Sequence, residues 1–160
     1  KNKFVLAYEC EDATIVAEPK SDNEMDVAGQ DRGELFLWNG KPEDAYVCFE
    51  MAPRGAVLDY AARFYRQLDT AWDAAGLRMA GVITEDGYRV EAELSAEALA
   101  PFGITLAEGA SFRAGLFRGN TQKAAHSDDD FMWITWVEAG LPQPDFHVAE
   151  SFGRFILMDR

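Results

Sequence analysis

Two glutamates lie within short apolar runs, where a charged side chain is unusual. Glu34 opens the run from 34 to 38, and Glu50 lies near the end of the run from 46 to 51. Successive side chains of an extended chain point to opposite faces, so each glutamate shares a sheet face with the apolar residues two and four positions away. A carboxylate on a partly buried sheet face requires a partner of opposite charge.

Arg113 and Arg118 are the candidate partners, because they lie in another strand-like run. Two interpretations follow from such pairs. They form structural ion pairs that stabilise one layer of the fold, or they form a polar floor that hydrogen-bonds the hydroxyl groups of a ligand. The residues alone leave both open.

A run of three acidic residues, Asp128-Asp129-Asp130, offers the oxygen ligands that Ca²⁺ prefers. It lacks the spacing of an EF-hand loop, and a solvated acidic loop is the alternative. The alternating acidic residues Asp22, Glu24 and Asp26 are a second candidate for the same role.

Catalytic patterns are weak. Glutamates at 34, 50, 91 and 93 are the types a glycosidase uses, but nothing in the sequence fixes the separation of such a pair. The chain has no Gly-x-Ser-x-Gly elbow, no phosphate-binding loop and no Cys–His arrangement. We therefore expect a non-catalytic protein.

Two cysteines, Cys10 and Cys48, both fall in strand-like segments. They form one disulfide bond or remain two buried thiols. With His126 and His147 they show no zinc-ligand spacing.

Composition limits the possible partners. The chain has 160 residues, 48% hydrophobic and 12% aromatic, which suffices for one domain with a sizeable core. Its formal net charge of -13 opposes contact with nucleic-acid phosphates and with anionic membrane surfaces. No apolar run approaches a membrane span of ~18 residues.

Short strand-like runs separated by turn residues must position these side chains. The expected strands are residues 4–8, 14–18, 34–38, 46–51, 56–60, 76–83, 88–94, 112–117, 132–137 and 152–157. A helical turn capped by Ser95 is expected at 96–99, and weak helical spacing appears at 60–67. The pattern predicts a single all-β domain over 1–160, an antiparallel β-sandwich of immunoglobulin-like or jelly-roll-like form with one or two short helices.

The order of several motifs carries a resemblance. Glu34-Leu35-Phe36-Leu37 is followed by Tyr46 to Gly55, Tyr88 to Leu94, Phe112 to Arg118, Trp133-Ile134-Thr135-Trp136, and Pro144 to Phe155. This order resembles the family 9 carbohydrate-binding modules and their relatives in the wider DOMON-like group. The resemblance covers most of the chain, and it suggests that a strand region found ahead of this segment in family members is missing here.

The resemblance implies a non-catalytic β-sandwich that binds oligosaccharide or polysaccharide, such as xylan or cellulose. It implies structural Ca²⁺, an extracellular or periplasmic location, and a glycoside hydrolase in the same chain or operon. In the family, a tryptophan in the loop before the Glu-Leu-Phe strand forms half of an aromatic clamp, whereas residues 21–31 here contain no aromatic residue.

The sugar-binding residues expected from this reading are Glu34, Glu50, Arg113, Arg118, Trp136 and Phe146. The aromatic rings would cover the apolar C–H face of a sugar. One alternative is a structural module that has lost its sugar site. Another is a haem-binding DOMON-like domain using methionine and histidine ligands, chosen from Met25, Met51, Met79, Met132, His126 and His147.

Overall fold

The computed structural model describes residues 3–18, 23–123 and 130–158. In chain order its elements are β1 (Lys3–Glu11), η1 (Glu24–Gly29), β2 (Arg32–Trp38), β3 (Tyr46–Met51), β4 (Val57–Arg63), β5 (Gln67–Asp69), β6 (Arg78–Ile83), β7 (Gly87–Ser95), α1 (Ala96–Leu99), η2 (Ala100–Phe102), β8 (Ser111–Thr121), β9 (Phe131–Thr135), η4 (Ala149–Ser151) and β10 (Gly153–Ile156). Within these residues, no helix has the length and apolar character needed to cross a membrane.

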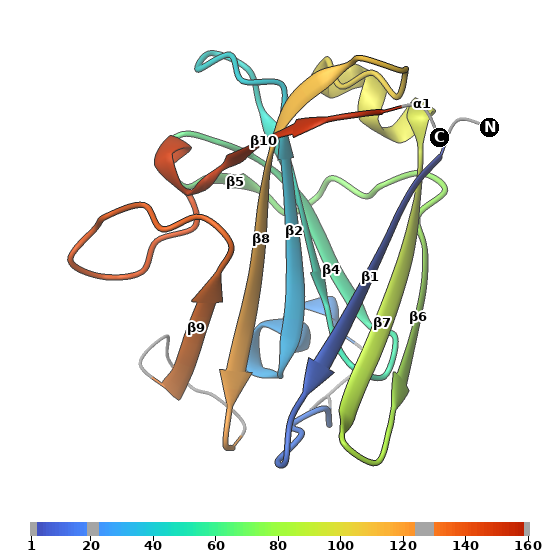
Figure 1. The fold of residues 1–160 in the computed structure, drawn as a ribbon, viewed down its shortest axis with the longest axis vertical. Helices are drawn as coiled ribbons and strands as arrows, with labels where there is room; N and C mark the ends of the chain where they lie inside the picture. The colour runs from blue at the N-terminus through green and yellow to red at the C-terminus, as the bar shows by residue number, and fades with distance from the viewer. Residues whose placement is uncertain (1–2, 19–22, 124–129, 159–160) are drawn as a thin grey trace.

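The strands form two antiparallel sheets. One has the order β1-β7-β6, and the other has the order β10-β8-β2-β3-β4-β5, with β9 also paired to β8. The smaller sheet lies against the larger one, and β9 stands on the side away from β6 (Figure 1). The predicted antiparallel β-sandwich with one or two short helices is confirmed.

Alternating apolar residues fill the space between the sheets. Leu35, Leu37 and Phe49 from the larger sheet meet Val90 and Leu94 from the smaller one, and all are 0–1% exposed. Burial of such a side chain contributes about 1.5–3 kcal/mol relative to exposure. This core holds the two sheets together.

A second apolar layer covers the outer face of the larger sheet. Phe36, Tyr46, Cys48 and Phe117 point to this side and pack against Phe152 from the C-terminal segment. All residues of β2 and β3 are buried, because these strands are covered on both faces. The layer supports the site described below.

Two sequence expectations for local structure are wrong, and one is confirmed. Residues 14–18 form no strand, because β1 pairs with β7 instead and Val16 N–H donates to Asp31. Residues 60–67 are not helical: β4 continues to Arg63 and then turns into β5. The Ser95 cap is present, with its hydroxyl accepting from Ala98 N–H at 3.1 Å.

Both cysteines are buried free thiols, so the disulfide alternative is excluded. Cys10 packs in the core between the sheets, whereas Cys48 belongs to the outer apolar layer.

Candidate functional site

Two buried carboxylates lie side by side on the outer face of the larger sheet. Glu34 on β2 and Glu50 on β3 are directly opposite in the strand register, and they are 2% and 7% exposed. Like charges in opposed positions destabilise a sheet pair. The pair therefore needs a cation.

Arg32, two residues before Glu34 on the same strand face, supplies that cation. Its Nε lies 2.9 Å from Glu34 Oε1 and 2.7 Å from Glu50 Oε2. Its Nη1 donates to the carbonyl oxygens of Ala28 and Gln30, at 2.9 and 3.2 Å. Burial disfavours the charge, but the two carboxylates outweigh it and raise the pKa of Arg32 above its ordinary value. The guanidinium is thus fixed and charged.

Tyr60 on β4 completes the charged centre. Its hydroxyl donates to Glu50 Oε1 at 2.9 Å, and the residue is 3% exposed. Burial, followed by the negative charges around it, raises the pKa of Tyr60 far above its ordinary range. The phenol therefore remains a hydrogen-bond donor.

Aromatic rings form one wall beside these charges. Phe146 stacks on Phe117 with centroids 3.9 Å apart and an interplanar angle of 7°, and Trp133 meets Phe146 edge-on at 5.2 Å. The Arg32 guanidinium lies over the rings of Phe131 and Trp133, at 4.7 and 5.2 Å. Such stacking favours the guanidinium cation.

Two glycines on β8 make room for this arrangement. A Cβ on Gly115 would lie 2.3 Å from the Phe117 ring. A Cβ on Gly119 would lie 3.1 Å from Trp133 and 3.2 Å from Arg32 Nη1. Bare backbone at these positions lets the rings and the guanidinium lie flat on the sheet.

The rim of the site joins the β4–β5 turn to the C-terminal segment. Arg66, which has a φ of 53°, donates from Nη2 to Asp145 at 3.1 Å, and the Tyr65 hydroxyl donates to the same carboxylate at 2.5 Å. Burial raises the pKa of the Asp145 carboxyl, but bonds from Tyr65 and from His147 N–H, with the charge of Arg66, leave it below its ordinary value. The Asp145 carboxylate is thus ionised and hydrogen-bonded, and it joins the β4–β5 turn to the C-terminal segment.

His147 anchors the same segment over the sheet. Its Nδ1 lies 2.8 Å from the Tyr46 hydroxyl, and its ring packs against Phe36. Burial lowers the pKa of His147 to about 4, with the nearby Arg66 charge acting in the same direction. The imidazole is neutral at pH 7.

A pocket of about 230 Å³ lies among these residues and opens to solvent. Its lining is Met25, Ala28, Arg32, Glu34, Glu50, Leu58, Tyr60, Arg66, Leu68, Thr70, Trp133, Pro144, Phe146 and His147. A second hollow of about 340 Å³ follows the 137–146 segment and shares Trp133, Pro144 and Phe146 with the first. We call the first hollow the Arg32 pocket.

Among known proteins, solved structures match this chain. No family model matches the chain, and neither does any curated protein. A proposed carbohydrate-binding protein from Bacteroides uniformis matches with a TM-score of 0.76 and 18% identity, over 98% of this chain and 73% of that one. A family 9 carbohydrate-binding module from Caldicellulosiruptor kristjanssonii, solved in complex with glucose, matches with a TM-score of 0.55 and 18% identity, over 99% of this chain and 72% of that one.

The chain has the fold of a family 9 carbohydrate-binding module. The wider DOMON-like grouping stays a prediction. Three of the six residues expected to bind sugar on this module fold, Glu34, Glu50 and Phe146, line the Arg32 pocket.

The expected arginine partners are wrong, because the guanidinium that contacts both glutamates belongs to Arg32. Arg113 is on the same sheet face but opposite Trp38, four residues along β2 from Glu34, which is roughly 13 Å. It is exposed and donates to the Phe152 carbonyl at 3.5 Å.

Arg118 and Trp136 lie on the other side of the larger sheet. Arg118 pairs with Asp12 at 2.6 Å and lies over the Tyr88 ring. Trp136 is 51% exposed and meets Phe155 edge-on. Both line a shallow depression of about 650 Å³ that is separate from the Arg32 pocket.

The residues that sequence reasoning missed include Arg32, Tyr60, Arg66 and Trp133. Arg32 carried a signal, since it is two residues from Glu34 and shares its face if the strand begins earlier. Trp133 carried a signal as well, because it is three residues from Trp136 and a strand therefore places the two rings on opposite faces. Arg66 comes from a turn whose position depends on tertiary contacts.

The acidic residues expected to bind calcium fall mostly outside the described residues, since Asp128 and Asp129 are not among them. Asp130 is described, and its carboxylate pairs with Lys123 at 3.1 Å. Asp26 is on η1, whereas Asp22 is again outside the described ranges.

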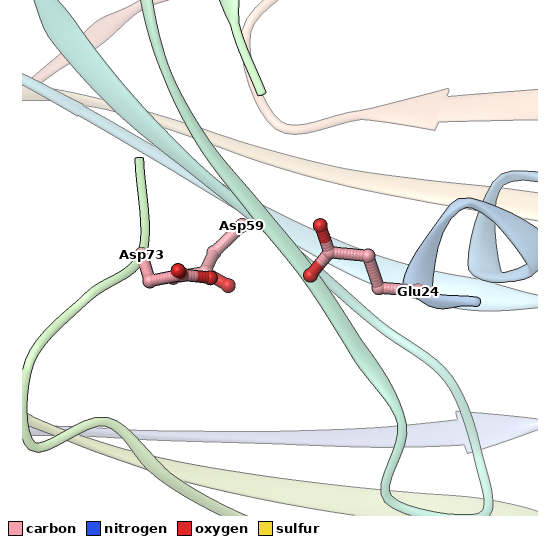
Figure 2. Close-up of side chains that lie close together, drawn as sticks. All are labelled: Glu24, Asp59 and Asp73. Carbon is pink, nitrogen blue, oxygen red and sulfur yellow. The ribbon is translucent and has the colours of Figure 1, made fainter. Parts of the chain in front are cut away.

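A different acidic cluster includes Glu24 and two residues that the sequence did not suggest. One carboxylate oxygen each from Glu24, Asp59 and Asp73 lie within 4.8 Å of one another, and Figure 2 shows the three side chains converging from η1, β4 and the segment after β5. Burial, then the charges of the other two residues, raises the pKa of Glu24. Asp59 is buried and accepts from Ala74 N–H at 2.6 Å.

Proposed function

We propose that the Arg32 pocket binds carbohydrate. The observation that carries this proposal is the fixed centre of Arg32, Glu34 and Glu50 beside the rings of Phe146 and Trp133. A sugar presents hydroxyl groups and apolar C–H patches, so its site needs placed polar groups next to an aromatic surface. The likeness to a glucose-bound module of the same fold supports the proposal.

The polar groups are held before any ligand arrives. Carboxylate oxygens of Glu34 and Glu50 accept from sugar hydroxyls, and Arg32 and Tyr60 keep those carboxylates in place. Charge-assisted hydrogen bonds are the stronger kind. Preorganisation lowers the entropy that binding must overcome.

The apolar part of the ligand meets the aromatic wall on one side. The 21–31 loop, which has no aromatic residue, contributes Met25 to the pocket lining instead. Met25 is 49% exposed, and Leu68 is 47% exposed. We infer a one-sided aromatic platform faced by aliphatic side chains.

The proposal includes a non-catalytic role. A glycosidase requires one carboxyl group that carries a proton to the leaving oxygen. Here a single guanidinium contacts both carboxylates, so internal contacts already engage both of them. The arrangement suits binding better than acid catalysis.

Several finer points rest on the resemblance. We propose oligosaccharides of plant polysaccharides such as xylan or cellulose as ligands, a glycoside hydrolase as partner, and an extracellular or periplasmic location.

Structural Ca²⁺ is also part of the proposal, with Glu24, Asp59 and Asp73 as one candidate site and the run Asp128-Asp129-Asp130, which lies mostly outside the described residues, as another. Three carboxylates fit the oxygen-only ligand preference of this ion. A bound cation would remove the repulsion among them.

The direct test is calorimetric titration of the purified protein with glucose, cellobiose and xylobiose, preceded by a glycan array. We expect saturable binding of at least one of these sugars. Absence of binding on the array and in all three titrations would overturn the proposal.

A further inference from the structure

The second hollow, of about 340 Å³, adjoins the Arg32 pocket. The two share the side chains of Trp133, Pro144 and Phe146. They also meet at the rim ion pair, because Arg66 lines the first and Asp145, 3.1 Å from Arg66 Nη2, lines the second. A ligand that is longer than the Arg32 pocket can therefore extend past the shared side chains into the second hollow.

The segment that forms the second hollow is held at both ends. At its start, the Thr135 hydroxyl donates to the Val137 carbonyl at 2.6 Å. At its end, the Ser151 hydroxyl donates to the Phe146 carbonyl at 2.8 Å, and Asp145 accepts from the residues of the rim. These internal bonds fix the shape of the hollow before a ligand arrives, which lowers the entropy that binding must overcome.

Two polar side chains of the second hollow remain available to a ligand. Glu138 and Gln143 line it, are exposed, and form no hydrogen bond or ion pair with the residues that the structure describes. A carboxylate accepts hydrogen bonds, and an amide both donates and accepts them, so the two can bond sugar hydroxyls. Leu141, which is 45% exposed, and the ring of Trp133 supply apolar surface beside them. The second hollow thus repeats the combination of polar groups and apolar surface that a sugar requires.

We propose that the second hollow binds the next sugar unit of an oligosaccharide whose first unit occupies the Arg32 pocket. This inference rests on the proposed function and adds the length of the ligand: the site prefers linked sugars of two or more units to a monosaccharide. Trp133 and Phe146 lie along the junction between the two units. Gln143 and Glu138 bond hydroxyl groups of the second unit.

A comparison of ligand lengths measures what the second hollow contributes. Calorimetry compares glucose with cellobiose, and xylose with xylobiose. In each series that the protein binds, we expect the disaccharide to bind about tenfold or more tightly, because the second unit adds hydrogen bonds and apolar contacts. Equal affinities of monosaccharide and disaccharide would overturn the inference.

Two further ligands separate the second ring from the linkage oxygen. Methyl β-glucoside and 4-O-methylglucose each carry one of the two oxygens through which a neighbouring glucose unit is joined, but neither carries a second ring. We expect both to bind more weakly than cellobiose. If either matches cellobiose, the gain comes from the linkage and not from the second hollow, and the inference is overturned.

Variants of the second hollow locate the gain in the structure. Gln143→Ala and Glu138→Ala should each lower the ratio of disaccharide affinity to monosaccharide affinity about threefold, roughly the loss of one hydrogen bond. Ala139→Trp places a large ring in the hollow and should bring the ratio close to one. Glu91→Ala, at an exposed position of β7 on the other sheet, should leave the ratio unchanged.

The outcomes distinguish this inference from the proposed function. If the disaccharide is preferred but all three variants of the hollow keep the native ratio, the second unit lies elsewhere and the inference is overturned. If glucose and cellobiose bind equally well, the pocket still binds sugar and only the second subsite fails. If none of the sugars binds, the proposed function fails with it.

Discussion

At the scale of single residues, the site depends on Arg32, whose side chain joins the two glutamates. A buried cation between two carboxylates is costly to assemble, but removing it takes from both buried carboxylates the ion pair that they share. Its position two residues before Glu34 places it on the pocket face without any special backbone feature. Arg113, on the same face, makes a single long hydrogen bond at the surface.

Replacing each of these arginines by methionine should therefore give very different results. Arg32→Met should lower the free energy of unfolding by about 3–5 kcal/mol, the cost of breaking a buried ion pair. Arg113→Met should change it by about 0.5 kcal/mol or less, as for an ordinary surface substitution. Urea denaturation measures both, and equal losses would contradict the assignment of Arg32 as the partner.

At the scale of elements, the segment from Pro144 to Phe152 closes the outer face of the larger sheet. It is fixed by His147 on Tyr46, by Asp145 on Arg66 and Tyr65, and by Phe146 on Phe117. Phe146 is half-buried, so it supports the fold as well as lining the pocket. Loosening this segment should disturb the pocket.

Acid should loosen the segment from Pro144 to Phe152 by protonating His147. The pKa of His147 is near its ordinary 6.5 in the unfolded chain and about 4 in the folded one. Above pH 6.5 both states are neutral and its contribution is fully present. As the pH falls from 6.5 toward 4, the unfolded state binds the proton first, and stability is lost by up to roughly 3 kcal/mol.

Urea denaturation between pH 7 and pH 4.5 measures this slope, with His147→Gln as the comparison. The variant should lack the part of the slope that His147 contributes, while raised carboxylate pKa values such as that of Asp59 affect both proteins alike. Parallel stability curves for the two proteins would exclude His147 as the cause.

The acidic cluster links η1 and β4 to the segment after β5, and this link predicts a calcium response. Millimolar Ca²⁺ should raise the melting temperature relative to EDTA, because a ligand of the folded state stabilises it by about 2.7 kcal/mol at 100 times its Kd. Asp73→Asn should raise the melting temperature in EDTA by relieving repulsion, and should abolish the response to Ca²⁺. Identical melts of the native protein in both buffers would remove the calcium proposal.

At the scale of the whole molecule, two sheets and an extra layer produce one strongly acidic body. The net charge of -13 should prevent binding to duplex DNA, since each phosphate contact requires a basic group. A gel-shift assay at physiological salt should show free DNA only. A shifted band that weakens as salt is raised would contradict this.

Much of the fold was predictable, because alternation and turn residues mark most strands. Tyr46–Met51 was predicted with the observed bounds, and Tyr88–Leu94 fell one residue short at each end. The partner of β1 could not be predicted. Residues 14–18 look like a hairpin strand, but β7, far along the chain, provides the pairing.

The sequence predicted Glu34, Glu50 and Phe146 as residues of the site, but it did not predict Arg32. The sequence pattern predicted a strand that begins at Glu34, whereas β2 begins at Arg32, so Arg32 was not considered as the partner of Glu34. Because β2 is buried on both faces, apolar and polar residues hardly alternate along it. Trp133 and Trp136 are three residues apart, so alternation separates them, and the register of β9 with β8 decides which of them meets the pocket. The gathering of Glu24, Asp59 and Asp73 depends on long-range packing.

The central claim, that the Arg32 pocket is the sugar site, is tested most directly by two tryptophan substitutions. Trp133 lines that pocket, whereas Trp136, three residues along, lines the depression on the other side of the sheet. Calorimetric titration with the sugar that the native protein binds should show about 1–3 kcal/mol weaker binding for Trp133→Ala, the value of burying one large side chain. Trp136→Ala should bind like the native protein, and the reverse result would place the site on the opposite side of the sheet.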